Sequence, residues 1–231
     1  MILSNEDILN TCENGSSIVV EPFSEELLQP ASYDLRVGDQ AASSAKKEVL
    51  DLIKTGFIEI MPGDFVVMLT YEKLTLDLQH TARFGLTSSY ARKGLLATIG
   101  PQVDPGFEGR LIVGLTNLSS RPIVLPYKDR FLTIEFHRLE QPSSTPYEGP
   151  YQGRDRLSPD DIKTALEREY MSQTEMIKML EALVSTVDNL KSTVDNLKQT
   201  INWKLPLILG GIMAVAIALF GGIVAILLSA L

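Results

Sequence analysis

Cysteine and histidine are almost absent from this sequence. One cysteine, Cys12, and two histidines, His80 and His137, occur among 231 residues. A single cysteine excludes a disulfide within the chain and any cysteine-rich zinc site, and two histidines are too few for a histidine metal cluster. We therefore expect no zinc, and we expect the polar part of the chain to lie in the reducing cytoplasm.

Basic residues are scarce relative to acidic ones. The chain has 21 Lys and Arg against 29 Asp and Glu, a net charge of −8. Because binding to a phosphate backbone needs a basic face, this balance excludes a nucleic acid polymer as a partner and leaves nucleotide monomers open. The opening residues, MILSNEDILN, lack the basic segment and long apolar run of a secretory signal, so we expect none.

A long apolar run is present near the other end of the sequence. Residues 205–231 carry no charged side chain. A helix of this length extends roughly 40 Å, enough to cross the roughly 30 Å hydrocarbon core of a membrane once but not twice. Lys198 and Lys204 precede the run and nothing basic follows it, which favours a single-pass C-terminal anchor with the N-terminal domain in the cytoplasm. A buried core helix is the alternative interpretation.

A seven-residue repeat, STVDNLK, occurs at 185–191 and again at 192–198. Seven residues is the period of a coiled coil, so we expect a helical stalk that oligomerises. Its apolar seam has Leu180, Val187, Val194 and Ile201 at the a positions and Met176, Leu183, Leu190 and Leu197 at the d positions. β-Branched a residues with leucine at d favour a parallel dimer, and a monomeric amphipathic helix is the alternative. With Ser158 as cap, we expect helix from about 159 to 203.

Between residues 14 and 140 the pattern consists of short apolar runs that end in turn residues, which is typical of strands. The expected strands are 17–20, 33–37, 57–60, 65–70, 82–86, 111–116, 123–125 and 131–136. Strands and helices do not alternate as a parallel sheet requires, so we expect one mainly β domain, a barrel or jelly roll. A short helix is expected after Ser4, and 45–54 is expected to be a second helix or an irregular insertion.

Several motifs, in the same order and spacing, resemble the dCTP deaminase branch of the dUTPase superfamily. They are MILSNEDI at the start, EPFSEELLQPASYDLRVG at 21–38, MPGDFVVMLTYEKLTL at 61–76, SSYARKGL at 88–95, VDPGFEGRLIVGLTN at 103–117 and YEGPYQG at 147–153. The resemblance implies a distorted β-barrel or jelly roll that forms a homotrimer. It also implies sites at subunit interfaces that bind pyrimidine deoxynucleoside triphosphates with Mg²⁺ and without zinc.

These observations together predict three domains. Residues 1–155 form the dCTP deaminase/dUTPase-like β domain, 156–203 the coiled-coil stalk and 204–231 the transmembrane helix. Since a threefold β domain would bring three stalks onto one axis, a trimeric stalk is favoured over the dimer that the a and d residues prefer alone.

The resemblance assigns a catalytic and sugar-binding role to Asp104, the aspartate that orients the attacking water in dUTP-hydrolysing members. A carboxylate can accept hydrogen bonds from a sugar hydroxyl and from water at once. The resemblance also assigns Ser88, Ser89 and Arg92 to the triphosphate and to the site of chemistry. The alternatives are a purely structural Asp-Pro-Gly turn at Asp104 and a surface helix that contains Arg92.

Further substrate contacts follow from the YEGPYQG motif, in which the resemblance assigns Tyr147, Tyr151 and Gln152 to the nucleotide. Asp34, in SYDLR, matches an aspartate that acts through the hydrated metal in the dUTPase branch. A buried strand carboxylate paired with Arg36 would look the same in the sequence.

The sequence departs from the family at the base for deamination. Deaminating members place a glutamate ten residues after the position of Asp104, and here position 114 is glycine. Glycine neither takes a proton nor orients a water, so we expect impaired deamination. Glu108 and Glu135 are the nearby carboxylates that would have to replace it, although Glu108 is expected in the turn before the strand.

Three phosphate-binding positions depart as well, with Thr87, Thr133 and Pro150 in place of the usual arginine, glutamine and lysine. Each lost charge-assisted contact costs about 1.5–3 kcal/mol, so triphosphate binding should weaken unless other cations compensate. The candidate replacements are Lys93, Lys128 and Arg130.

Two functions remain open at this point. The first is a membrane-anchored homotrimer that binds a pyrimidine deoxynucleotide without efficient deamination, as a sensor, effector or scaffold. The second is an enzyme of dUTP/dCTP metabolism, either an active dCTP deaminase with a displaced base or a dUTPase-like hydrolase that uses Asp104. The departures at Gly114 and the phosphate positions favour the first.

Overall fold

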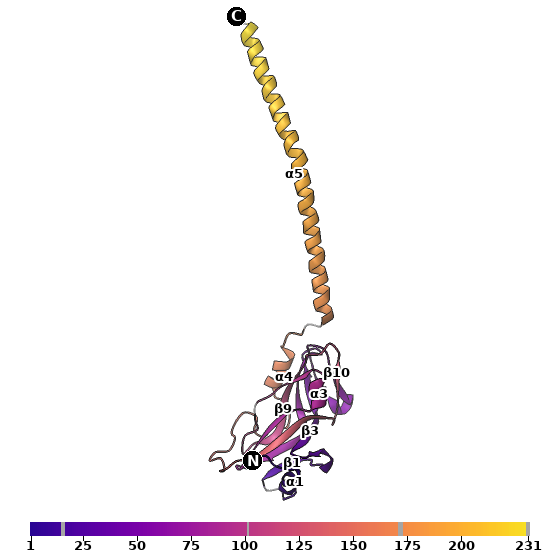
Figure 1. Ribbon diagram of the computed structural model, residues 1–231, viewed down its shortest axis with the longest axis vertical. Helices are drawn as coiled ribbons and strands as arrows, with labels where there is room; N and C mark the ends of the chain where they lie inside the picture. Colours follow the sequence, from indigo (N-terminus) through magenta and orange to yellow (C-terminus); the bar gives the residue numbers. More distant parts are fainter. Residues whose placement is uncertain (15–16, 101, 171–172, 230–231) are drawn as a thin grey trace. The chain divides into compact units, whose positions relative to one another are not determined.

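The computed structural model of the protein describes residues 1–14, 17–100, 102–170 and 173–229. The chain divides into two compact units, Met1–Gln173 and Thr174–Leu231. The first unit is mainly β and the second is one helix (Figure 1).

The first unit is built on a nine-stranded antiparallel sheet with the order β7-β11-β3-β6-β9-β8, to which β1, β2 and β4 are added at its sides. The strands are β1 (Ile18–Glu21), β2 (Leu28–Gln29), β3 (Ser32–Ser43), β4 (Glu48–Asp51), β6 (Phe65–Leu76), β7 (His80–Leu86), β8 (Leu95–Thr98), β9 (Glu108–Asn117) and β11 (Arg130–Arg138). A separate pair joins β5 (Phe57–Ile60) to β10 (Ile123–Pro126).

The two ends of this sheet nearly meet. Ala82 of β7 pairs with Val103, which follows β8, through backbone N–O distances of 3.1 and 2.8 Å. Long strands such as β3 and β6 change register along their length, so the sheet curves around the core. The result is a distorted, nearly closed β-barrel (Figure 1), and the expected fold class is confirmed.

Every strand expected from the sequence is present, although β3 and β6 run several residues further than their apolar patterns indicated. Residues 45–54 differ from the expected helix or insertion: they contribute β4 and then a one-turn helix, α2 (Leu52–Thr55). Asp51 caps α2 by accepting a hydrogen bond from the Ile53 N–H, and Gly56 ends it in the left-handed conformation. β4 pairs with β3, a partner that its own sequence does not reveal.

Short helices cover parts of the barrel. They are α1 (Asn5–Asn14), the 3₁₀ turn η1 (Glu25–Leu27) and α3 (Ser88–Arg92). α1 is the expected N-terminal helix: Asp7 Oδ2 accepts from the Ser4 N–H at 3.0 Å and Ser4 Oγ accepts from the Asp7 N–H at 3.3 Å. The hydrogen bonds that Ser4 Oγ, at 2.7 Å, and the Ser4 N–H donate to the Asp7 carboxylate lower its pKa below the ordinary value.

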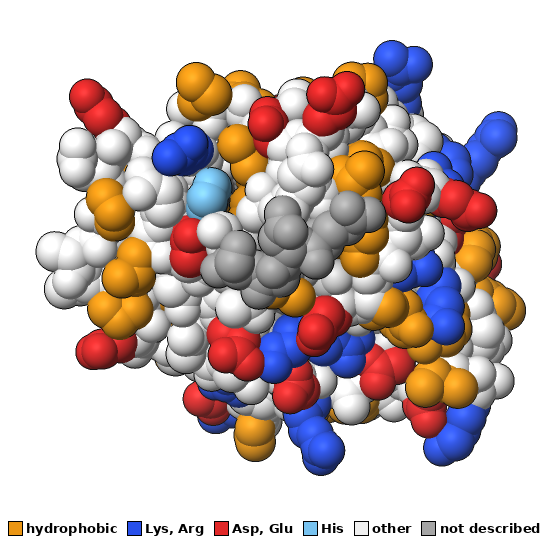
Figure 2. Space-filling view, turned by 90° about the horizontal axis from the view of Figure 1, so that it is seen from below, with side chains coloured by type: hydrophobic (Ala, Val, Ile, Leu, Met, Phe, Trp, Pro, Cys, Tyr) orange, Lys and Arg blue, Asp and Glu red, His pale blue; other side chains and the backbone are white. Residues whose placement is uncertain are grey.

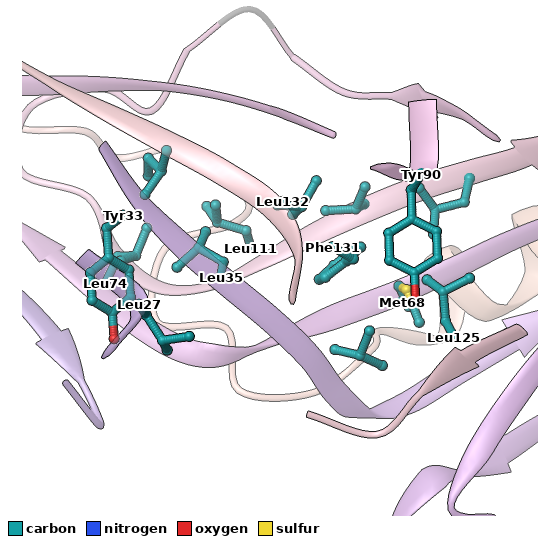
Figure 3. Close-up of a cluster of buried hydrophobic side chains, with 14 of the residues drawn as sticks. Leu27, Tyr33, Leu35, Met68, Leu74, Tyr90, Leu111, Leu125, Phe131 and Leu132 are labelled. Atoms are coloured by element: carbon teal, nitrogen blue, oxygen red, sulfur yellow. The ribbon is translucent and has the colours of Figure 1, made fainter. Parts of the chain in front are cut away.

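The core fills the interior of the barrel with side chains from nearly every strand (Figure 3). Tyr33, Leu35 and Phe131 are completely buried, as the inward positions of alternating strands should be. Tyr90 extends from α3 toward the cluster that contains Met68 and Leu125, and it fixes α3 to the barrel (Figure 3). Burial, together with the hydrogen bond that its hydroxyl donates to Asp129, raises the pKa of the phenol far above its usual value.

Buried polar groups tie the turns to the sheet. Asp64 is completely buried and accepts hydrogen bonds from Ser43 Oγ at 2.9 Å, Ser44 Oγ at 2.8 Å and the Ala45 N–H at 2.9 Å. Asn117, also completely buried, donates to the Ile60 and Arg121 carbonyls at 2.8 Å. Both side chains therefore replace backbone partners at places where strands end.

On the surface the charges are mixed. The face of the first unit seen from below shows acidic, basic and apolar side chains side by side (Figure 2). Such interspersed charges suit a soluble domain.

Residues beyond the barrel form a further helix that packs against it. α4 (Pro159–Leu166) begins with a capping box in which Ser158 and Asp161 exchange hydrogen bonds. Its buried Ala165, with the preceding Leu157, packs against Phe65, Val67 and other side chains on the outer face of the sheet. α4 ends at Leu166 and the next helix starts at Gln173, so the single helix expected from 159 to 203 is interrupted.

The second unit is the helix α5 (Gln173–Ser229). The eight apolar side chains of the expected a and d seam are 47–61% exposed. Within the described residues one helical segment, Glu175–Gly221, is long and apolar enough to cross a membrane. Trp203 and Lys204, residue types that favour the membrane–water boundary, lie just before its charge-free part, and Pro206 is accommodated inside the helix.

The Asp64 cluster predicts a large stability loss on substitution. Asp64→Ala should lower the free energy of unfolding by about 3 kcal/mol or more, because each buried donor left without an acceptor costs roughly 1–3 kcal/mol. Urea unfolding followed by near-ultraviolet circular dichroism measures it. The exposed Asp160→Ala should change stability by less than about 0.5 kcal/mol, and equal effects of both substitutions would contradict the assignment.

Candidate functional site

A cleft of about 550 Å³ opens beside the ends of β8 and β9. Its walls come from three parts of the chain: the strands, the segment 147–151 and the helix α4. The lining residues that bear on function are Asp104, Gly114, Tyr147, Tyr151, Asp161 and Thr164. Three residues that the sequence analysis assigned to the nucleotide, Asp104, Tyr147 and Tyr151, therefore meet in one place.

Asp104 lies in the turn between β8 and β9 and is partly exposed. Its carbonyl accepts from the Phe107 N–H at 3.2 Å, and Gly106 supplies the positive φ of 79° that this tight turn needs. Asp104 Oδ1 accepts from Gln102 Nε2 at 2.6 Å. The carboxylate is thus held at the edge of the cleft and retains acceptor capacity for a sugar hydroxyl or a water.

The segment that contains the YEGPYQG motif is hydrogen-bonded to the turn that contains Asp104. The Tyr147 N–H donates to the Pro105 carbonyl at 2.8 Å, and the Tyr147 ring packs on Phe107 with centroids 5.8 Å apart. Gln152 donates to the Gly106 carbonyl at 2.9 Å and accepts from the Glu108 N–H at 3.0 Å. Gln152 therefore holds this segment in place, while Tyr147 and Tyr151 line the cleft.

Gly114 lies on β9 between Val67 of β6 and Thr98 of β8. A Cβ atom at this position would lie 3.0 and 3.1 Å from two ring carbons of Phe65 and 3.2 Å from the Thr98 carbonyl oxygen. These distances are shorter than normal carbon contacts. The space that a side chain at 114 would enter is therefore occupied by an aromatic ring.

α4 and the residues that flank it contact the Phe65 ring. Phe65 belongs to the same apolar cluster as Ala165 and Leu157. The guanidinium of Arg168 lies 4.5 Å from the centre of the Phe65 ring, and Lys47 Nζ donates to the Leu166 and Arg168 carbonyls at 2.8 Å. A cation at the C-terminal end of a helix satisfies its free carbonyls and favours its dipole, so α4 is fixed at both ends.

Ser88, Ser89 and Arg92 do not line the cleft in this chain. They belong to α3, where all three are exposed. The surface helix considered as the alternative for Arg92 is thus present. The predicted roles of these three residues in triphosphate binding stay predictions, because an exposed side chain can also serve a neighbouring copy.

Asp34 also lies outside the cleft, on β3. Its Oδ2 accepts from Gln29 Nε2 at 3.2 Å, and burial raises its pKa above the ordinary value. The alternative in which Asp34 pairs with Arg36 is wrong. Arg36 instead binds the completely buried Glu72, with Nε 2.5 Å from Oε1 and the backbone N–H 2.8 Å from Oε2.

Neither carboxylate considered as a substitute for the missing glutamate reaches the cleft. Glu108 is the first residue of β9, not part of the turn before it, and it binds Lys73 Nζ at 2.6 Å. Glu135 is exposed on β11, 3.6 Å from His137 Nε2. Both are absent from the described lining of the cleft.

The candidate replacements for the lost phosphate contacts lie elsewhere too. Lys93 Nζ lies 4.5 Å above the Tyr90 ring, and Lys128 Nζ lies 4.5 Å above the Tyr71 ring. The positive charge of Arg130 favours the ionised form of Asp34. Among the departing positions, Thr133 donates to Ser32 Oγ at 3.1 Å. Within the described residues, the cleft of one copy thus gains no cation from these positions.

The sequence analysis missed Arg110, the cation that does line the cleft. Its Nη2 lies 2.6 Å from Asp39 Oδ1, and its Nε donates to the Thr70 carbonyl at 2.6 Å. Its guanidinium lies close to Gly38, where a Cβ would be 2.4 Å from Arg110 Nη2, but the sequence alone does not reveal this approach. Phe65 and Asp161 were missed as well, since neither has a local pattern that points to the cleft.

Comparison with known proteins gives consistent matches to the first unit. A family model described as dCTP deaminase-like matches residues 2–139. The dCTP deaminase of Pyrococcus horikoshii is 45% identical over 140 residues, which cover 61% of this chain and 88% of that protein. A "dCTP deaminase, dUMP-forming" of Aquifex aeolicus is 34% identical over 173 residues, 70% of this chain and 95% of that protein.

Two further matches bear on the fold and on the range of relatives. A probable deoxyuridine 5'-triphosphate nucleotidohydrolase of Sulfolobus islandicus rod-shaped virus 1 is 39% identical over 156 residues, 66% of this chain and 93% of that protein. The crystal structure of 2'-deoxycytidine 5'-triphosphate deaminase from Agrobacterium tumefaciens superposes with a TM-score of 0.51 at 21% identity. The superposition covers 60% of this chain and 47% of the Agrobacterium tumefaciens chain. At that identity the superposition supports the fold alone.

The contact between position 114 and Phe65 predicts a coupled stability effect. Gly114→Ala should lower the free energy of unfolding by about 1–3 kcal/mol, because the new methyl group is forced against the ring. In a Phe65→Leu background the same substitution should cost less, so the double-mutant cycle should show coupling. Gly85→Ala on β7 is the matched control, since nothing lies within 4 Å of its Cβ. Additive effects of Gly114→Ala and Phe65→Leu would contradict the contact.

Proposed function

Since this chain belongs to the dCTP deaminase-like family, we propose that residues 1–155 bind a pyrimidine deoxynucleoside triphosphate in the cleft that contains Asp104. In this proposal the sugar hydroxyl is bound by Asp104 and the base lies beside Gly114, between the strands and Tyr147 or Tyr151. The observation that carries it is the meeting of these residues in one cleft of about 550 Å³, large enough for a nucleoside.

Deamination is expected to be impaired at this site. Water attack on the base needs a proton acceptor, and Gly114 provides none. The Phe65 ring lies where a longer side chain at position 114 would start, which supports the proposal that this site works without a carboxylate there. Binding without efficient deamination fits a sensor, effector or scaffold.

Hydrolysis of the triphosphate is the second candidate function. It rests on Asp104, which is present and partly exposed, and on the relatives named as a dUMP-forming deaminase and a probable nucleotidohydrolase. A fixed carboxylate that orients water near a phosphorus atom is what such a reaction needs.

Mg²⁺ would bind through the triphosphate and not through a cluster of protein side chains. Within the described residues no group of three or more His, Cys, Asp or Glu side chains could hold a metal ion. Mg²⁺ commonly keeps several waters and binds through substrate phosphates, so the ion would neutralise the nucleotide. Asp34, held by Gln29 outside the cleft, would act on it only indirectly.

The active assembly is proposed to be a homotrimer. α3 exposes three side chains of types that bind phosphate: Ser88, Ser89 and Arg92. In the cleft, by contrast, Arg110 is already bound to Asp39. A complete site would therefore combine the cleft of one copy with α3 of its neighbour. Three copies around one axis would also gather three α5 helices.

The stalk is proposed to be a parallel coiled coil that leads to a single-pass membrane anchor, with the β domain in the cytoplasm. Lys191 and Lys198 occupy the e positions and Thr186 and Thr193 the g positions. An antiparallel pair would place lysine opposite lysine, whereas a parallel arrangement places lysine opposite threonine. The exposed apolar seam, 47–61% accessible in one copy, would be buried between copies.

Nucleotide binding and turnover test the first proposal. In detergent micelles with Mg²⁺, we expect the full chain to bind dCTP or dUTP by calorimetry, and Asp104→Asn to weaken binding at least about tenfold because a charge-assisted hydrogen bond is lost. Asp188→Asn in α5 is the control. Conversion of dCTP to dUTP should be at least about a thousandfold slower than by the Pyrococcus horikoshii enzyme assayed in parallel.

Each outcome of that assay separates the candidates. Brisk dUTP formation would refute impaired deamination, and the absence of binding would refute the nucleotide site. Pyrophosphate release that disappears in Asp104→Asn would establish the hydrolase.

Disulfide cross-linking tests the parallel stalk. Leu190→Cys at a d position should form a disulfide between copies under mild oxidation, whereas Ser192→Cys at an f position should not. Native Cys12 should not interfere, because burial raises the pKa of its thiol to about 11 and keeps it protonated at neutral pH. Equal cross-linking of the two variants, or none for either, counts against the coiled coil.

A further inference from the structure

One wall of the cleft comes from beyond the residues that the family model matches. The family model ends at residue 139, and α4 begins at Pro159. Asp161 and Thr164 of α4 nevertheless line the same cleft as Asp104 and Gly114. A carboxylate from beyond the matched residues therefore lines the same cleft as the position where the family glutamate is missing.

The carboxylate of Asp161 is fixed in position through one of its two oxygens. Oδ2 accepts from the Ser158 N–H at 2.8 Å and from Ser158 Oγ at 2.6 Å. Among the residues that the structure describes, none donates a hydrogen bond to Oδ1. The capping box thus restricts the side chain and leaves one oxygen free to accept.

Among the described residues of the cleft, no cation pairs with this carboxylate. Arg110 is the cationic residue among the described lining, and its guanidinium is bound to Asp39 and to the Thr70 carbonyl. α4 holds its own position through Ala165 and through Lys47 at its far end. Asp161 is therefore a rigid acceptor in the cleft, not a mobile surface carboxylate.

We propose that Asp161 selects 4-aminopyrimidine nucleotides, the cytosine class, over 4-oxopyrimidine nucleotides, the uracil class. This inference rests on the proposed function, which places the base beside Gly114. The exocyclic amine of cytosine donates hydrogen bonds, and a carboxylate only accepts them. The 4-oxo group of uracil would face the carboxylate with its own lone pairs, so both groups would lose hydration without a bond.

An asparagine at this position reverses the chemistry with the same shape. In Asp161→Asn the amide oxygen can still accept from the Ser158 N–H, and the amide N–H₂ then faces the cleft as a donor. A donor suits the 4-oxo group and opposes the 4-amino group. The substitution therefore predicts a reversed preference, which a mere change in helix stability does not.

The experiment measures dCTP and dUTP affinity of the full chain in detergent micelles with Mg²⁺ by calorimetry. The wild type should favour dCTP at least about tenfold, the scale expected of one charge-assisted hydrogen bond. Asp161→Asn should abolish or reverse that ratio. Asp160→Asn, an exposed neighbour outside the cleft, should leave it unchanged.

Two controls separate selectivity from folding and from the proposed function itself. Ser158→Ala weakens the cap of α4 but keeps the carboxylate, so it should retain the preference for dCTP even if both affinities fall. A ratio measured on one variant is insensitive to the fraction folded. If Asp161→Asn binds both nucleotides with the wild-type ratio, the inference is overturned and the nucleotide site stands. If the wild type binds neither nucleotide, the proposed function and the inference both fail.

Discussion

The contact between the Phe65 ring and the backbone of Gly114 determines how this barrel differs from a barrel with a catalytic carboxylate at that position. Two ring carbons would lie 3.0 and 3.1 Å from a Cβ at 114, and the Thr98 carbonyl closes the opposite side. A packed interior tolerates such a change only if neighbours shift. A side chain at position 114 would therefore require Phe65 to shift, so Gly114 fits the packing around it.

The same ring connects the barrel to the segment that follows it. Phe65 packs with Ala165 and Leu157, and Arg168 lies over its outer face. α4 is thereby held on the sheet through Ala165, while Ser158 and Lys47 hydrogen-bond to the backbone groups at its two ends. One aromatic side chain thus excludes a side chain from position 114 and provides the surface on which α4 docks, so the cleft and the C-terminal extension depend on the same contact.

Local patterns in the sequence were sufficient for most of the barrel and for the Asp104 turn. Short apolar runs predicted eight of the strands but not β2, β4 or β8, and the family resemblance around Asp104 indicated the edge of the cleft. The interruption of the helix after Leu166, and the approach of Asp161 and Phe65 to the cleft, were not predictable in the same way. They arise from packing between segments far apart in the chain, such as Lys47 with Leu166, for which neither segment has a periodic signal. The pairing of Arg36 with Glu72 instead of Asp34 has the same origin.

The charges around the cleft argue for a division of the ligand between copies. Asp104 and Asp161 line the cleft, and the guanidinium of Arg110 is bound to Asp39. Phosphate groups would meet repulsion there, whereas a sugar hydroxyl and an amino group would find acceptors. The triphosphate is better served by the exposed Ser88, Ser89 and Arg92 of α3, which lie outside this cleft in the same copy. In the proposed trimer, the cleft of one copy would be completed by α3 of its neighbour, and the α5 helices would hold the copies together.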